Sequence, residues 1–252
     1  MGTIRLVVRL PVLAVVTVFV EVLLVLGLLP AHLLGRREAL NAWILRLWSR
    51  LALCVIGVRV EVRGTPPRAP FFLVSNHVSY LDIVLLGRNT GASFIAKSEV
   101  RSWPLMGWLA RSVGTLFVDR GRPKDVVRVA REIEAKLARG RGLILFPEGT
   151  STSGRDVVPF RGSLLAPLAR SESEVHYASV RYVTGPGDPP ARDVVAWWGD
   201  MAFGGHFLKL LSLRRIEARI VFGAEPHRNP DRKALAASLH QAVAETFEPI
   251  PH

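Results

Sequence analysis

A histidine and an aspartate five positions apart, His77 and Asp82, stand between two apolar segments. Residues 71–74 before them are typical of a short buried strand, and residues 83–86 after them are apolar again. In one continuous helix, five steps of about 100° would leave the two side chains roughly 140° apart. We therefore expect a strand that ends near Ser75, a turn that carries His77 and a helix whose first turn contains Asp82. The carboxylate could then orient the imidazole, as in the base half of a catalytic triad.

A nucleophilic side chain to complete such a triad is not evident. The sequence has no Gly-x-Ser-x-Gly motif, and its single cysteine, Cys54, lies within the apolar segment 51–56. The attacking group is therefore expected to be a hydroxyl of the substrate, which His77 would activate as a general base.

Two further motifs follow the first, which is Asn-His-x-Ser-x-x-Asp at residues 76–82. Residues 114–120 read Gly-Thr-Leu-Phe-Val-Asp-Arg, and residues 146–150 read Phe-Pro-Glu-Gly-Thr. In this order, the three motifs resemble those of the glycerolipid acyltransferases typified by 1-acylglycerol-3-phosphate acyltransferase. The resemblance covers residues 71–183 closely, and three ordered motifs are far more specific than any one of them.

This resemblance implies the transfer of an acyl group from a thioester to a lysolipid hydroxyl, without an acyl-enzyme. The donor would be acyl-CoA or an acidic acyl carrier protein, and no other cofactor is implied. The implied catalytic residues are His77 and Asp82. The implied acceptor-binding residues are Arg120, Glu148, Gly149 and Thr150. We add as supporting residues Asn76, Ser79, Arg155 and Arg161.

The acceptor can be interpreted in two ways. Arg120, Arg155 and Arg161 provide guanidinium groups that suit a phosphate, which favours 1-acylglycerol-3-phosphate and its conversion to phosphatidic acid. The alternative is a lyso-ornithine lipid, because Ser151 stands where the family often has arginine. Residues 151–154 and 196–201 also resemble the branch that acylates lyso-ornithine lipids. We prefer the first acceptor. Outside this class, the chain could be a non-catalytic lipid-binding membrane protein, or a hydrolase that uses water as acceptor.

The composition favours a membrane surface as the anionic partner. The chain of 252 residues carries 33 Lys and Arg against 21 Asp and Glu, a formal net charge of +12, and 49% of its residues are hydrophobic. No zinc spacing, basic helix or aromatic RNA-binding pattern points to nucleic acid. The seven histidines show no metal-ligand spacing, so we infer no metal.

Two hydrophobic segments open the chain. Residues 10–31 contain one charged residue, Glu21, and as a helix would measure about 33 Å, long enough to cross a bilayer or to lie in it. A signal peptide is the rival interpretation. Residues 36–56 place Trp43 and Trp48 at helical spacing with Arg46 and Arg50, which indicates an interfacial helix.

We therefore divide the chain into membrane-anchoring helices at residues 1–56 and an acyltransferase domain at residues 57–252. If the first helix spans, arginines 36, 37, 46 and 50 outweigh Arg5 and Arg9 and place the domain in the cytoplasm.

Strand-like and helical patterns alternate after residue 57. The expected strands are residues 58–62, 71–74, 93–96, 115–118, 143–146, 177–183 and 216–222. The clearest helices are 124–139, which Pro123 starts, and a last one that follows Asp231 as N-cap and runs to about residue 247. Residues 197–213 indicate either a packing helix or a second membrane-touching surface. The pattern predicts an α/β fold with a mostly parallel sheet flanked by helices, preceded by the hydrophobic helix pair. His77, Arg120 and Glu148 each follow a strand, so we expect them at one edge of the sheet.

Overall fold

The computed structural model describes residues 2–104, 106–119 and 121–251. Within these residues, strands form one sheet in the order β1-β7-β6-β2-β5-β3-β4. The strands are β1 Val58–Arg63, β2 Phe71–Ser75, β3 Ser93–Lys97, β4 Leu116–Val118, β5 Gly142–Leu145, β6 Val175–Thr184 and β7 Ile216–Phe222. Every neighbouring pair is parallel except β6 and β7. The predicted mostly parallel sheet is confirmed, and each predicted strand occurs with its ends within two residues of the prediction.

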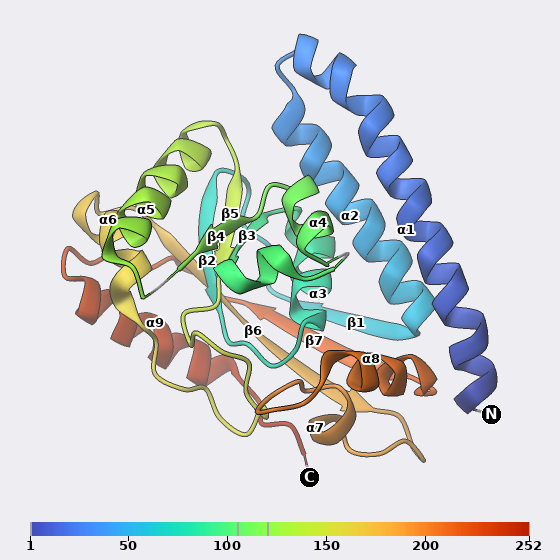
Figure 1. Cartoon of the computed structure of the whole chain (residues 1–252). Coiled ribbons are helices and arrows are strands. Elements are labelled where there is room, and N and C mark those ends of the chain that lie inside the picture. The colour runs from blue at the N-terminus through green and yellow to red at the C-terminus, as the bar shows by residue number, and fades with distance from the viewer. Residues whose placement is uncertain (1, 105, 120, 252) are drawn as a thin grey trace.

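Helices pack on both faces of this sheet (Figure 1). They are α1 Gly2–Leu33, α2 Arg37–Ile56, α3 Leu81–Thr90, α4 Met106–Ser112, α5 Pro123–Ala138, α6 Ala166–Arg170, α7 Ala191–Val194, α8 Phe203–Ser212 and α9 Arg232–Thr246, with 3₁₀ turns η1 Ser98–Ser102 and η2 Gly162–Leu165. Pro123 begins α5, as predicted. The Asp231 carboxylate accepts hydrogen bonds from the N–H groups of Lys233 and Ala234, which confirms it as the N-cap of α9.

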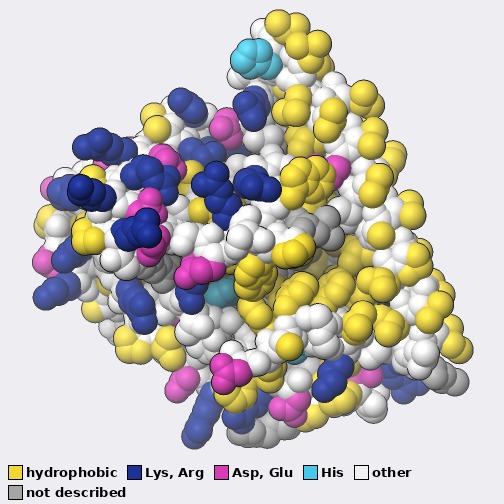
Figure 2. All heavy atoms as spheres, viewed as in Figure 1, with side chains coloured by type: hydrophobic (Ala, Val, Ile, Leu, Met, Phe, Trp, Pro, Cys, Tyr) yellow, Lys and Arg dark blue, Asp and Glu magenta, His cyan; other side chains and the backbone are white. Residues whose placement is uncertain are grey.

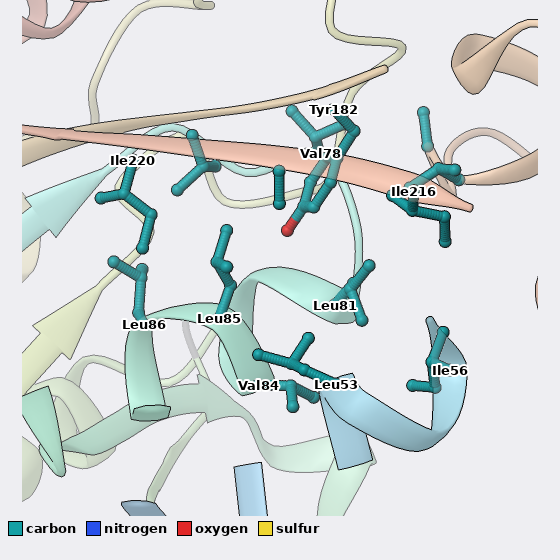
Figure 3. Packing of buried hydrophobic residues seen from close by; sticks show 14 of the residues in the cluster. Leu53, Ile56, Val78, Leu81, Val84, Leu85, Leu86, Tyr182, Ile216 and Ile220 are labelled. Atoms are coloured by element: carbon teal, nitrogen blue, oxygen red, sulfur yellow. The ribbon is translucent and has the colours of Figure 1, made fainter. Parts of the chain in front are cut away.

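The core consists of two apolar layers, one on each face of the sheet. Leu73 of β2 belongs to the layer that includes residues of α2, α3 and α8 (Figure 3). Its neighbours Phe72 and Val74 belong to the layer that includes residues of α5, α6 and α9. Successive side chains of a strand point to opposite faces, and here both faces are buried. This explains why β2 is a continuous apolar run.

The hydrophobic helix pair lies along the domain (Figure 1). The two helices run side by side, and both are long and apolar enough to cross a membrane. However, α2 packs on the domain. It contacts α3 and buries Leu45 and Leu53 in the core, and near its N-terminal end Glu38 Oε2 lies 3.7 Å from Arg141 Nε. Since α2 rests on the domain from one end to the other, α1 forms the outermost layer. Most of its apolar side chains face away from the protein.

Arg5 and Arg9 are not free flanking charges of a membrane segment. Arg5 Nε donates to the carbonyl of Ser212 at 2.8 Å, and Arg9 Nη1 donates to the carbonyls of Leu211 and Leu213 at 3.0 and 2.6 Å. These carbonyls lie at the end of α8, where a helix has unpaired acceptors. The start of α1 is thus fixed to the end of α8. These contacts do not show on which side of a membrane the domain lies, so its cytoplasmic placement stays a prediction.

Candidate active site

The turn between β2 and α3 brings the first motif together. His77 Nδ1 lies 2.7 Å from Asp82 Oδ2, which confirms the predicted contact across a turn. The same oxygen accepts the backbone N–H groups of Val78 and Ser79 at 2.7 and 3.0 Å, while Ser79 Oγ accepts the N–H of Leu81 at 3.3 Å. This reciprocal pattern resembles a capping box at the start of α3. The motif spacing therefore follows from how a helix begins.

Asp82 is fully buried, and donors surround its carboxylate. Besides the three groups on Oδ2, the Tyr182 hydroxyl donates to Oδ1 at 2.7 Å. Charge-assisted hydrogen bonds of this kind stabilise a carboxylate away from water. Sequence reasoning did not single out Tyr182, because it belongs to a strand a hundred positions further along the chain.

The His77 ring is held on one side and open on the other. It stacks on Phe146 with ring centroids 4.1 Å apart and an interplanar angle of 14°. Its side chain keeps 19% of its surface exposed. Since Nδ1 is bound to Asp82, Nε2 is the nitrogen available to a substrate. This is the tautomer and orientation that a general base requires.

Glu148 lies three residues after the end of β5 and reaches the first motif. Its Oε1 accepts the backbone N–H of His77 at 3.3 Å, and the residue is only 2% exposed. Burial raises the pKa of Glu148 to about 9, and the nearby charges of Asp82 and Asp156 add to this effect. Within the described part of the chain, Oε2 has no hydrogen-bond partner. A neutral carboxyl group therefore presents one unused polar atom at the site.

The loop after the third motif returns to His77. Gly149 has φ = 84°, a conformation that favours glycine, and Thr150 is exposed. The N–H and Oγ1 of Thr152 donate to the carbonyl of His77 at 2.9 and 3.2 Å. The first and third motifs are thus joined by backbone contacts, as expected from the ends of adjacent parallel strands.

The remaining predicted site residues differ in where they lie: one is buried in the fold, two are exposed, and one is outside the described residues. Asn76 is buried and forms two hydrogen bonds with the backbone of Val180. Its Nδ2 donates to the Val180 carbonyl at 3.0 Å, and its Oδ1 accepts the Val180 N–H at 2.8 Å. Asn76 therefore fastens the turn to β6. Arg155 and Arg161 are exposed, and the backbone N–H of Arg161 donates to the carbonyl of Pro147 at 2.9 Å. Arg120 lies outside the described residues.

An aromatic group borders the turn. The backbone N–H of Trp197 donates to the carbonyl of Val78 at 2.9 Å, and the rings of Tyr80, Trp103, Trp197, Phe203 and Phe207 contact one another. The Tyr80 hydroxyl also lies 3.0 Å from Nδ1 of the buried His206. Residues 197–213 were predicted as either a packing helix or a second membrane-touching surface. Within this stretch α8 packs on the core, while contact with a membrane stays a prediction. One side of α8 buries Leu210 and Leu211, and the other exposes Leu208.

The face shown in Figure 2 separates apolar from basic surface. Hydrophobic side chains gather over α1 and continue inward, while Lys and Arg gather over the α5 side. Among the described residues, no group of three or more His, Cys, Asp or Glu side chains is placed to hold a metal ion. The site brings together the imidazole of His77, the carboxylate of Asp82 and the neutral carboxyl group of Glu148.

Comparisons with known proteins agree with this geometry. A family model described as Acyltransferase matches residues 57–177. The chain is 35% identical over 201 residues to the lyso-ornithine lipid O-acyltransferase of Rhodobacter capsulatus, covering 77% of this chain and 72% of that protein. It is 28% identical over 213 residues to the 1-acyl-sn-glycerol-3-phosphate acyltransferase of Neisseria meningitidis, covering 83% of this chain and 82% of that protein.

The fold is also found in a solved structure. The crystal structure of the 1-acyl-sn-glycerophosphate (LPA) acyltransferase PlsC from Thermotoga maritima matches the whole of both chains, with a TM-score of 0.68 and 20% sequence identity. At that identity, the likeness supports the fold alone. The relative of 35% identity and the matched family model lead to one conclusion: the chain belongs to the acyltransferase family, among the lysolipid O-acyltransferases.

Proposed function

We propose that this chain transfers a fatty acyl group from an acyl thioester to the hydroxyl of a lyso-ornithine lipid. The observation that carries this choice is the identity of 35% to a lyso-ornithine lipid O-acyltransferase, against 28% to a lysophosphatidate enzyme of similar coverage. This reverses the preference drawn from the sequence, which favoured lysophosphatidate. The arginines behind that preference bind a carboxylate as readily as a phosphate, so their charge did not discriminate.

Two local features support the same acceptor. Ser151, which replaces an arginine common in lysophosphatidate enzymes, directly precedes Thr152, the residue bound to the His77 carbonyl. The stretch 196–201 is tied to the turn through Trp197 and Val78. Both segments that resemble the lyso-ornithine branch therefore lie against the candidate active site. Residues of these two segments are in position to affect which head group is accepted.

The proposed mechanism uses His77 as general base. Nε2 removes the proton of the acceptor hydroxyl as its oxygen attacks the thioester carbonyl carbon. The carbon–sulfur bond then breaks, and the leaving thiolate takes the proton from the imidazolium, which gives an ester and a free thiol. Asp82 keeps the ring in the required tautomer and stabilises the imidazolium. Neither step requires a nucleophilic side chain of the protein.

The proposed acceptor site surrounds this base. Arg120, Glu148, Gly149 and Thr150 keep the roles that the family resemblance implies. The neutral carboxyl of Glu148 can donate a hydrogen bond through its unused oxygen, which an ionised carboxylate cannot do. We infer that it holds a polar oxygen of the acceptor near His77. The exposed Arg155 and Arg161 supply positive charge for the carboxylate of the ornithine head group.

We further propose that α1 lies within the membrane surface and does not cross it. Because α2 rests on the domain along its length, a spanning hairpin would carry the domain into the hydrocarbon region. An in-plane α1 with its apolar face outward avoids this. Residues 1–56 would then anchor the acyltransferase domain of residues 57–252. The excess of basic residues fits the anionic cytoplasmic leaflet, where we place the domain.

A panel of acceptors tests the assignment. Purified protein in detergent micelles receives one labelled acyl thioester with lyso-ornithine lipid, with lysophosphatidate or with no lysolipid. We expect diacyl ornithine lipid as the main product. Phosphatidic acid alone would restore the lysophosphatidate assignment, free fatty acid in all arms would indicate a hydrolase, and no turnover would indicate a lipid-binding protein. Running the panel with acyl-CoA and with acyl carrier protein identifies the donor.

A further inference from the structure

Tyr182 places a hydroxyl group inside an apolar layer of the core. The residue lies on β6 and has no exposed surface. Figure 3 shows its ring directed from the sheet toward α3, with the oxygen near Leu81 and Leu85 and the ring beside Val78. All these neighbours belong to the same apolar cluster. A phenylalanine would fill this space equally well, so the oxygen calls for a separate explanation.

The hydroxyl has one hydrogen-bond partner among the described residues, and that partner is Asp82. Tyr182 Oη donates to Asp82 Oδ1 at 2.7 Å. A buried hydroxyl without a partner is unfavourable, so the ring and the carboxylate constrain each other. The bond joins the middle of the sheet to the first turn of α3, between residues a hundred positions apart.

The two carboxylate oxygens of Asp82 accept hydrogen bonds from different donors. Oδ2 receives His77 Nδ1 and the N–H groups of Val78 and Ser79, which fix the turn. For Oδ1, the Tyr182 hydroxyl is the donor in the described structure. Without that donor, a buried oxygen would lose its partner, and the carboxylate could rotate away from the imidazole. The negative charge of Asp82 would also be stabilised by fewer hydrogen-bond donors. The His77–Asp82 pair would therefore bind its proton more strongly.

We propose that Tyr182 is a positioning residue that acts through Asp82 on His77, fixing the carboxylate and limiting the basicity of the His77–Asp82 pair. The proposal rests on the proposed function only in assigning His77 as the base. It does not depend on which lysolipid is the acceptor.

The first test is Tyr182→Phe, with Tyr177→Phe as matched control. Tyr177 lies on the same strand but packs in the other apolar layer, against His227. In Tyr182→Phe, the acid limb of the kcat profile should move to higher pH, because the pair now holds its proton more strongly. The plateau kcat should fall about tenfold, the effect of roughly one hydrogen bond to a charged group, with KM nearly unchanged. Tyr177→Phe should keep the wild-type profile.

A second measurement does not require turnover. The ¹³C-labelled histidine signals of the protein in detergent are titrated by NMR, and the His77 signal is identified by its loss in His77→Ala. The His77 titration midpoint should rise in Tyr182→Phe and stay at the wild-type position in Tyr177→Phe. If His77 titrates in this way but its removal leaves turnover intact, the proposed mechanism fails while the role of Tyr182 stands.

A third variant distinguishes a hydrogen-bond effect from a folding defect in Tyr182→Phe. Site-specific 3-fluorotyrosine at position 182 keeps the shape and makes the hydroxyl a stronger donor, so the acid limb and the His77 midpoint should move to lower pH. Opposite shifts in the two variants identify a hydrogen-bond effect. The proposal is overturned if neither variant moves the midpoint, even where thermal stability falls, because that pattern describes a packing residue alone.

Discussion

Glu148 Oε1 accepts the backbone N–H of His77 at 3.3 Å, so the turn between β2 and α3 is bound to a carboxyl group almost entirely removed from water. Burial raises the pKa of this group to about 9 from an ordinary value of 4.5. At neutral pH the folded protein therefore keeps a proton that the unfolded chain releases. The neutral form accepts from the backbone N–H of His77 and retains a hydrogen-bond donor on its other oxygen.

Glu148→Gln should flatten the pH dependence of stability. Between pH 4.5 and about 9 the folded state of the wild type binds the extra proton, so its stability falls as the pH rises through this window. Glutamine keeps the shape without titrating. Urea unfolding at several pH values, with the exposed Glu134→Gln of α5 as control, should show a smaller alkaline loss only in Glu148→Gln. Equal slopes in wild type and Glu148→Gln would mean that Glu148 is ionised in the fold.

His77→Ala and Asp82→Asn should each remove most acyl transfer. General-base catalysis is typically worth about 10²- to 10⁴-fold, and the asparagine can no longer accept and stabilise an imidazolium as a carboxylate does. The measurement is kcat with the preferred lysolipid, together with the fraction of protein that floats with vesicles, which should not change. His32→Ala, at the exposed end of α1, is the control and should keep full activity. Substantial turnover by purified His77→Ala would refute the mechanism.

The first motif was predictable because its geometry is local. A strand end, a turn and a helix start within eight residues determine that His77 and Asp82 meet, and the Ser79-x-x-Asp82 spacing is itself a helix-start signal. The contact of Tyr182 with Asp82 was not predictable, since it depends on the position of β6 beside β2 in the sheet. The contacts of the N-terminal arginines were not predictable for a related reason. Their partners, the carbonyls at the end of α8, lie about two hundred residues away.

Arg9→Ala should loosen the attachment of α1 to the domain. The guanidinium donates to the carbonyls of Leu211 and Leu213, which would otherwise lack these partners. Since the site is partly exposed, we expect a loss of about 1–2 kcal/mol in unfolding free energy. Thermal melting in detergent measures the effect, and the exposed Arg36→Ala beyond the end of α1 serves as control. Equal melting temperatures in the two variants would show that these hydrogen bonds do not hold α1.

Substitution of the outer face of α1 tests whether that face enters the bilayer. Removing residues 1–56 is a poor test, because α2 would go too, and Leu53 and Ile56 belong to the core. Val22→Asp leaves the fold intact, since the Val22 side chain is already 49% exposed. A charge on the lipid-facing side of an in-plane helix opposes burial of its apolar face, so partition into vesicles at high salt should fall by about tenfold. Val127 on α5 is equally apolar and 53% exposed, but it lies among basic residues, so Val127→Asp should leave partition unchanged.

A similar loss in both variants would instead mean that added negative charge alone weakens binding, and that the apolar face of α1 does not contact lipid.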